Sequence, residues 1–469
     1  MQEAVSERRG VFASIRDAIR GDSHRDFTKE PIGRAITLLA IPMVLEMMME
    51  SLFAVVDMFW VAHLGADSVA SVGLTEAVLT LLFSVAMGLS VATAAMVARR
   101  IGEKNPEGAA ETAAQSILLG LIVAGVTGLT GAWFAPDILR LMGASDSIVA
   151  TGTGYTRVIY GGSAAVMLLF LINGVFRGAG DAVLAMRVLW TANLVNLVLN
   201  PLLIFGLGPF PRLGVLGSGI GTTIGRSTGV LIQIWMLTRG RSRVVLRARY
   251  FHFRPDTMSR LIRLSIGGIF QYFVGMASWI GLVRMVAAFG SVAVAGYTVA
   301  MRIFIFAILP SWGMANAAAT LVGQNLGAGK PDRAEQSVWR AGFYNMLFLG
   351  LVAVVFVAFA RPLASVFTGD ASVVQVASTA LRVISYGYVF YAWGMVIMQA
   401  FNGAGDTYTP TAIAICTNWA FQIPLAWFLA FKMGVGPNGV FSAVAISASI
   451  YAVTAVLVFR RGTWKQQRV

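Results

Sequence analysis

Residues 176–181 read FRGAGD, and 225 positions further on residues 401–406 read FNGAGD. Other landmarks keep the same spacing, namely RIGEKNPEGA (100–109) with NLGAGKPDRA (325–334), TRVI (156–159) with LRVI (381–384), Gly65 with Gly290, and Asn193 with Asn418. Separate landmarks at one offset, without a gap, indicate an internal duplication rather than chance similarity. The chain is therefore predicted to consist of two copies of one structural unit.

The composition places both copies in a membrane. Of 469 residues, 57% are hydrophobic and only 12% are charged, whereas soluble proteins have about 25% charged residues. Apolar runs long enough to cross a bilayer recur along the whole chain. We expect an all-α polytopic membrane protein with spans near residues 35–63, 69–98, 110–134, 150–176, 184–206, 214–237, 258–288, 292–323, 336–360, 376–402, 409–431 and 439–459.

These spans give twelve transmembrane helices in two pseudo-symmetric six-helix lobes. Because six is even, both lobes enter the membrane the same way round and are expected to be related by an axis along the membrane normal. The predicted parts are a cytoplasmic N-terminal segment (1–34), an N-lobe (35–238), a basic cytoplasmic linker (239–257), a C-lobe (258–460) and a cytoplasmic tail (461–469).

Loop charges set the predicted orientation. Nearly all flanking Lys and Arg lie on the side shared by the two termini, and the opposite loops carry only Arg140, Arg212, Arg361 and Lys432. The positive-inside rule then places both termini in the cytoplasm, with the chain in the inner (plasma) membrane. The net charge of +14 follows from these basic loops, so no nucleic-acid partner is expected.

The sequence lacks the residues that several classes of function require. A single cysteine, Cys416, excludes an internal disulfide framework and a cysteine-based metal site, and the three histidines are scattered. The Gly-rich FRGAGD and FNGAGD stretches connect membrane helices and follow no strand, so they do not fit a dinucleotide site. A phosphate-binding P-loop and an aspartate-rich Mg²⁺ motif are absent from the sequence. We therefore expect no enzyme and no cofactor.

Three acids interrupt the first span, IPMVLEMMMESLFAVVDMFW at residues 41–60: Glu46, Glu50 and Asp57. A charge at the centre of a lipid-facing helix costs about 2.5–3.5 kcal/mol. Each helical residue turns about 100°, so Glu50 and Asp57 lie within a few tens of degrees of Glu46. All three share one stripe, which must face protein or water.

Depth counting groups Asp57 with other polar side chains. Asp57 lies eight residues before Gly65, Asn200 lies eight before Gly208, and Thr222 lies eight after Gly214. Asn196 is one turn from Asn200, and Glu76 in the second span reaches a similar depth. The cluster Asp57, Asn196, Asn200, Thr222 and Glu76 suits a proton or a hard monovalent cation such as Na⁺. The alternative is structural, with Asp57 hydrogen-bonded and Asn200 stabilising a bend before Pro201.

A second set of residues is predicted to line a substrate cavity. Glu46 and Glu50 flank the methionines 47–49, and Met49 with its polarisable side chain suits a pocket that repacks around lipophilic cations. Proton relay by the glutamates, and methionine as simple core filler, remain open. Gln271 is the repeat partner of Glu46, and Arg302 lies deep in the eighth span, where it contacts either an acid across the cavity or an anionic substrate group.

Several motifs together resemble the MATE (multidrug and toxic compound extrusion) family. They are VVDMFWVAHLGADSVA (55–70), RRIGEKNPEGA (99–109), FRGAGDA (176–182), NLVLNPLLIFGLG (196–208) and FNGAGDT (401–407). The resemblance implies cation-coupled efflux with twelve helices in two lobes, and an acid in the first span that matches Asp57. The family's Asn-x-x-x-Asp pair of the fifth span reads Asn196…Asn200 here, which removes one negative charge and favours protonation of Asp57 over tight Na⁺ binding.

The predicted function is a secondary antiporter that exports amphiphilic organic compounds or drugs by alternating access, driven by H⁺ or Na⁺. Another branch of the family carries acids in the seventh and tenth spans, where this chain has Gln271 and Tyr391, so coupling in the C-lobe is not expected. The alternative function is a flippase of lipid-linked sugars or other lipids. Membrane lipids and a small-molecule substrate are the expected partners, and the expected state is a monomer.

Overall fold

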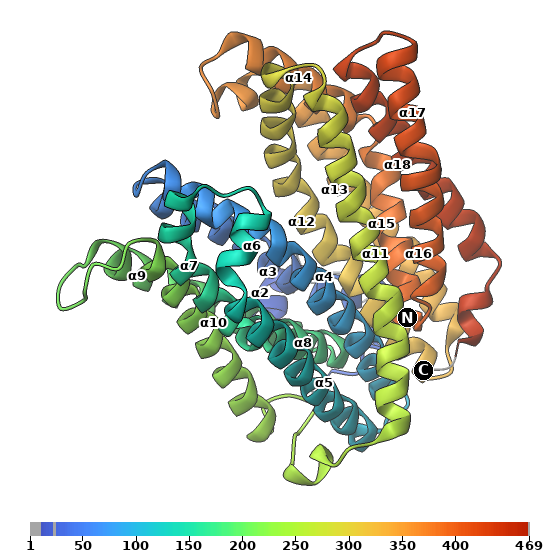
Figure 1. Ribbon diagram of the computed structural model, residues 1–469. Helices are drawn as coiled ribbons and strands as arrows, with labels where there is room; N and C mark the ends of the chain where they lie inside the picture. The colour runs from blue at the N-terminus through green and yellow to red at the C-terminus, as the bar shows by residue number, and fades with distance from the viewer. Residues whose placement is uncertain (1–10, 22–24, 468–469) are drawn as a thin grey trace. The chain divides into compact units, whose positions relative to one another are not determined.

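The computed structural model describes residues 11–21 and 25–467, and all regular elements within this part of the chain are helical (Figure 1). The predicted segments 1–34 and 461–469 therefore lie partly outside the described residues. The first half contains α2 (Val11–Arg20), α3 (Ile32–Ala62), α4 (Ala66–Gly102), α5 (Pro106–Trp133), α6 (Ala135–Leu141), α7 (Asp146–Gly161), α8 (Ser163–Ala179), α9 (Ala182–Phe205) and α10 (Val215–Thr238).

The second half repeats this order after the short helix η1 (Ala248–Phe251). It contains α11 (Pro255–Ala287), α12 (Ser291–Gly327), α13 (Pro331–Ser365), α14 (Ala371–Ser385), α15 (Tyr388–Ala404), α16 (Tyr408–Ala414), α17 (Ile423–Trp427), α18 (Pro437–Arg460) and η4 (Thr463–Gln466). The π-helical stretch η2 (Ile415–Gln422) joins α16 to α17, and a second one, η3 (Phe428–Lys432), continues α17, so that these elements form one helical segment.

The chain forms two compact units. We call Leu45–Ile269 with Arg20–Arg25 the N-terminal unit, and the rest, mainly Asp26–Val44 and Phe270–Val469, the C-terminal unit. The border inside α3 and the border inside α11 are separated by the same 225 residues as the sequence repeat. The predicted lobes 35–238 and 258–460 assign each of these helices to a single lobe, whereas the compact units divide both.

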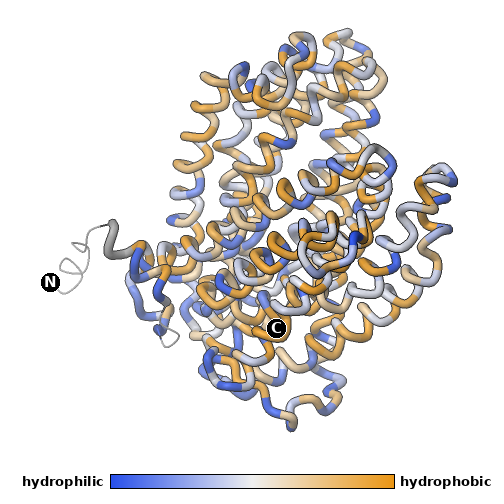
Figure 2. Tube along the Cα trace, turned by 90° about the vertical axis from the view of Figure 1, so that its left-hand side faces the viewer, coloured by the Kyte–Doolittle hydropathy of each residue, from blue (hydrophilic) through white to orange (hydrophobic). Residues whose placement is uncertain are grey.

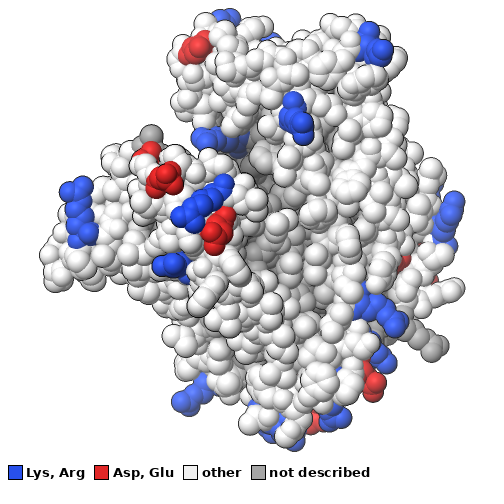
Figure 3. All heavy atoms as spheres, in the orientation of Figure 1, with Lys and Arg blue, Asp and Glu red and all other residues white. Residues whose placement is uncertain are grey.

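Nine helices in the described residues are long and apolar enough to cross a membrane, and two bent pairs raise the number to eleven. These elements coincide with eleven of the twelve predicted spans. The remaining one, at 214–237, is the 24-residue helix α10, whose many Gly, Ser and Thr residues and Arg226 lower its hydropathy. Figure 2 shows hydrophobic residues along most of the length of the helices, and Figure 3 shows a mostly uncharged surface facing the viewer.

Two predicted spans are broken rather than straight. α7 and α8 meet at an angle of 41°, and α14 and α15 meet at 58°. The breaks occur at Gly162 and Gly387, which are repeat partners. At Gly162 a β-carbon would lie 2.6 Å from Thr223 Cγ2, so the close approach of α10 requires glycine at this position.

The repeat also appears in backbone geometry. Gly65 and Gly290 cap α4 and α12 with φ of 99° and 97° and ψ of 174° in both. Lys104, with φ of 57°, is the one described non-glycine residue in the left-handed region, and its repeat partner Gly329 has φ of 68°. The same backbone turn therefore follows the second helix of each unit.

A run of glycines brings α9 and α10 close together. Gly217, Gly221, Gly225 and Gly229 recur every fourth residue of α10, and each is buried. A β-carbon at Gly225 would lie 2.8 Å from the Ala192 carbonyl oxygen of α9. Small residues at this spacing let helix backbones approach closely in membranes. The contact aligns the polar face of α9 with the polar face of α10.

Candidate functional site

The three acids of α3 all face the interior of the N-terminal unit. Glu46 and Asp57 are 1% and 9% exposed, and the Glu50 side chain is 24% exposed. The opposite face of the helix carries the exposed apolar residues Met48, Leu52, Val55 and Phe59. The predicted stripe of acids is therefore turned away from the apolar surface, as the cost of a lipid-facing charge requires.

Glu46 is neutralised by an arginine. Its Oε1 accepts hydrogen bonds from Arg177 Nη1 and from Asn173 Nδ2, both at 3.1 Å. Arg177 Nη2 donates in turn to Ser90 Oγ of α4 at 3.0 Å. Gln233 Nε2 of α10 donates to Asn173 Oδ1 at 2.7 Å. Glu46 is thus the centre of a buried polar network that joins α3, α4, α8 and α10, rather than a side chain that faces open space.

Glu50 is neutralised in the same way. Arg226 Nη2 donates to Glu50 Oε1 at 2.7 Å, and Asn193 Nδ2 donates to Oε2 at 3.3 Å. The Arg226 guanidinium also lies over the rings of Phe53 and Phe170, with 5.2 and 5.9 Å to the ring centroids. Ion pairing and cation–π contacts both hold the arginine in place.

Asp57 differs from the two glutamates because its partners are neutral. Asn200 Nδ2 of α9 and Ser218 Oγ of α10 donate to Asp57 Oδ1, the latter at 3.3 Å. Within the described residues, no Lys, Arg or His forms an ion pair with Asp57. An ionised carboxylate is costly to bury unless a cation or a proton neutralises it. Asp57 is therefore the acid of α3 that has no ion-pair partner among the described residues.

The other predicted members of the Asp57 cluster differ in their contacts. Asn196 Nδ2 donates to Thr222 Oγ1 at 2.9 Å, so these two side chains pair with each other. Asn200 Oδ1 is buried and has no hydrogen-bond partner among the described residues. Glu76 is exposed on α4, and its side chain makes no hydrogen bond to the cluster in the described part of the chain.

The predicted cavity residues are divided between the two units. Glu46, Glu50 and the half-buried Met49 belong to the N-terminal unit, whereas Gln271 and Arg302 belong to the C-terminal unit. Gln271 is half-buried on α11, and Arg302 is exposed on α12. The role of this set as a substrate cavity stays a prediction.

Sequence reasoning missed several partners of the acids, namely Ser90, Asn173, Arg177, Asn193, Ser218 and Arg226. A signal for three of them was available. Ser218 and Arg226 lie one helical turn on either side of Thr222, and Asn193 lies one turn before Asn196. Polar residues at a spacing of three or four share one helix face, so the polar faces of α9 and α10 were readable from the sequence.

The chain resembles known transporters over almost its whole length. A family model described as MatE matches residues 42–202 and 264–428. The chain is 24% identical to the "Probable multidrug resistance protein YoeA" of Bacillus subtilis, covering 94% of this chain and 96% of that protein. It is 28% identical to the "Probable multidrug resistance protein NorM" of Caulobacter vibrioides, covering 92% of each chain.

Solved structures agree with these relatives. A structure described as the outward-facing conformation of a multidrug resistance MATE family transporter of the MOP superfamily matches with a TM-score of 0.88. The identity is 27%, and the match covers 94% of this chain and 98% of that one.

Proposed function

Because the chain belongs to the MATE family, we propose that it is a secondary antiporter that exports amphiphilic organic compounds in exchange for H⁺ or Na⁺, with Asp57 as the coupling acid. The observation that carries this proposal is the difference between the acids of α3. Glu46 and Glu50 are paired with Arg177 and Arg226, whereas Asp57 has only neutral donors. An acid without a cation can exchange one during each cycle without breaking an internal ion pair.

The surroundings of Asp57 favour a proton as the coupling ion. The two side chains that contact its carboxylate both donate hydrogen bonds, whereas a bound Na⁺ needs several oxygen ligands directed at it. Asn196 and Asn200 are amides, and the side chains that hydrogen-bond to Asp57 add no second negative charge to attract a metal cation. One proton is sufficient to neutralise the Asp57 carboxylate.

Reconstituted transport tests this proposal. The purified protein is reconstituted into liposomes, and the liposomes are loaded with a cationic fluorescent dye. A pH gradient and a Na⁺ gradient are then imposed in separate experiments. We expect the pH gradient to drive dye export. Export driven by Na⁺ alone would assign Na⁺ as the coupling ion at the same acid. Dye movement that responds to neither gradient would refute ion-coupled antiport.

The glycine run of α10 offers a test that replaces none of the polar side chains of the site. A β-carbon at Gly221 would clash with Asn200 Oδ1. Gly221→Ala is therefore expected to push the Asn200 amide away from Asp57 and to lower the initial transport rate about tenfold, while overpacking lowers stability by about 1–3 kcal/mol.

The matched control is Gly73→Ala on α4, where a β-carbon would meet nothing within 4 Å. Transport rates and thermal melting of the two variants are compared in the same detergent and liposomes. Equal rates for Gly221→Ala and Gly73→Ala would show that the position of the Asn200 amide does not matter for transport.

A further inference from the structure

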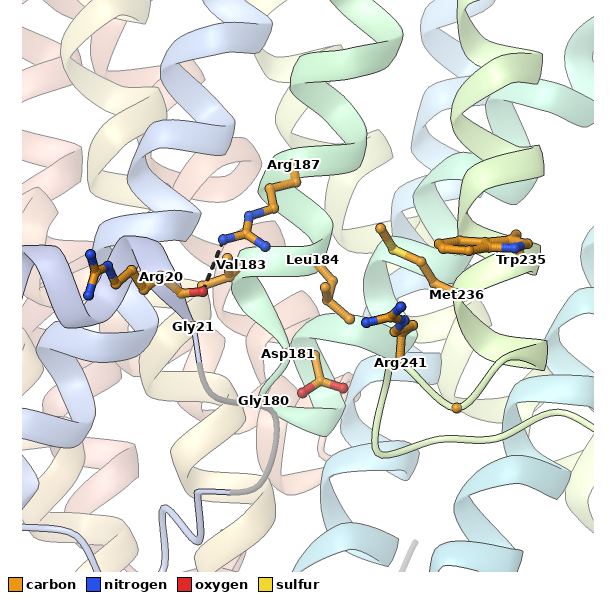
Figure 4. Close-up of a pocket in the computed structure, with 11 residues that line it drawn as sticks. Arg20, Gly21, Gly180, Asp181, Val183, Leu184, Arg187, Trp235, Met236 and Arg241 are labelled. Atoms are coloured by element: carbon orange, nitrogen blue, oxygen red, sulfur yellow. Dashed lines mark hydrogen bonds between the residues drawn. The ribbon is translucent and has the colours of Figure 1, made fainter.

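A cavity of about 560 Å³ lies in the N-terminal unit, away from the acids of α3. Its walls come from the end of α2, the loop between α8 and α9, the first turns of α9 and the end of α10 (Figure 4). These elements belong to the side of the chain that bears the basic loops. Among the lining residues are Asp181, Arg187, Trp235 and Arg241.

Two arginines on opposite walls give the cavity its charge. Arg187 extends from α9 and donates from Nη2 to the Arg20 carbonyl oxygen at 2.9 Å, while the Arg20 side chain points away (Figure 4). Arg241 follows α10, and its guanidinium carbon lies 6.0 Å from the centroid of the Trp235 ring. Each guanidinium contacts the protein, and both residues are exposed to solvent.

Among the described residues that line the cavity, the one acid, Asp181, has a structural role. Asp181 is 5% exposed, and its Oδ2 accepts from Ser242 Oγ at 2.6 Å and from the Arg243 backbone N–H at 2.9 Å. These bonds hold the loop after α10 against the start of α9. Asp181 thus fixes the position of Arg241 in the cavity, and the hydrogen bonds from Ser242 and Arg243 spread its negative charge.

Comparison with the second repeat shows that the fold does not require the positive charge of Arg187. Asp406, the partner of Asp181, caps its loop through Thr409, whose backbone N–H and Oγ1 lie at 3.0 and 2.7 Å. The position equivalent to Arg187, however, is Ala412. The acid and its loop are common to both units, whereas the arginine is added in one of them.

Exposed apolar residues lead away from the cavity along both neighbouring helices. On α9, Trp190, Leu194 and Val198 continue the face of Arg187 and are 44%, 55% and 53% exposed. On α10 the exposed apolar side chains next to the cavity are Leu231, Ile234 and Trp235. A cationic cavity at the end of an apolar helix surface is complementary to an anionic phospholipid, in which a charged headgroup is joined to acyl chains.

We propose that this cavity binds the phosphate of an anionic phospholipid headgroup between Arg187 and Arg241, with the acyl chains along the exposed faces of α9 and α10. A free phosphate ion shares the headgroup chemistry but not the acyl chains. The exposed apolar faces beside the cavity favour the lipid.

The test is a lipid titration of the purified full-length protein in detergent, followed by native mass spectrometry. Phosphatidylglycerol and phosphatidylcholine are added separately, and inorganic phosphate is then used as a competitor. We expect preferential retention of phosphatidylglycerol that phosphate does not displace. Arg187→Gln/Arg241→Gln should weaken this retention about twenty-five-fold, since each arginine near an anionic headgroup contributes roughly a factor of five.

The matched control is Arg247→Gln/Arg340→Gln, which removes two exposed arginines that do not line the cavity. If the double variant does not fold, Arg241→Gln alone is expected to weaken retention about fivefold. Equal retention of phosphatidylglycerol by the cavity variant and the control would overturn the proposal. Displacement of the lipid by inorganic phosphate would overturn the assignment to a lipid and leave a free phosphate as the ligand.

Discussion

Asp57→Asn is expected to reduce gradient-driven export to the background of empty liposomes while the protein still folds and inserts. The amide keeps an Oδ1 that accepts from Asn200 and Ser218, so the contacts of α3 with α9 and α10 persist. It cannot take up or release a proton, so the cycle has no coupling step. Thermal stability should be unchanged or higher, because the variant no longer buries a carboxylate that lacks a cation.

The matched control is Asp67→Asn, which changes an exposed acid of α4 whose Oδ2 accepts from Ser147 at 2.5 Å. Dye export under a pH gradient is measured for both variants, together with thermal melting. The control should retain the wild-type rate. Wild-type export by Asp57→Asn would remove Asp57 from the coupling mechanism and direct attention to Glu50 and Glu46.

Arg177→Asn is expected to destabilise the protein strongly. It removes the cation from Glu46, which is 1% exposed and keeps Asn173 as its remaining hydrogen-bond donor in the described residues. Removing one partner of a buried ion pair costs about 3–5 kcal/mol, because the other charge is left uncompensated. Thermal melting of the purified protein measures the loss.

The second half of the chain suggests the compensating change. The repeat partners of Glu46 and Arg177 are Gln271 and Asn402, so both equivalent positions there carry neutral side chains. Glu46→Gln/Arg177→Asn should therefore recover most of the stability that Arg177→Asn loses. A double variant as unstable as the single one would show that the individual hydrogen bonds, rather than the balance of charge, maintain this network.

The helical spans could be predicted from the sequence, but the bends inside two of them could not. A sequence periodicity shows that 150–176 and 376–402 are apolar and helical, but it does not show a bend. At Gly162 another helix approaches too closely for a β-carbon, and at Gly387 the Ala445 backbone would lie 3.1 Å from a β-carbon. The division of α3 and α11 between the units is likewise a property of packing, which no local pattern contains.

Some contacts of the candidate site could be predicted where the residues lie within well-defined spans. Counting residues from the helix ends placed Asp57 and Asn200 at one depth, and their side chains are in contact. Arg177 was missed because the fourth span was predicted to end at residue 176, so its charge was assigned to a loop. Helix α8 continues to Ala179 and carries the Arg177 guanidinium to Glu46.

The absence of a cationic partner at Asp57, within the described residues, has a consequence for the driving force. In the proposed mechanism the pairs at Glu46 and Glu50 remain internally balanced, so a cycle carries one elementary charge inward on Asp57. Export of a monovalent cation then moves no net charge across the membrane and responds to the pH difference alone. Export of a neutral compound moves one charge inward and also draws on the membrane potential, which supplies about 2.3 kcal/mol per charge for each 100 mV. Under the proposed mechanism, export of a cationic compound and export of a neutral compound therefore differ in their sensitivity to the voltage of the cell.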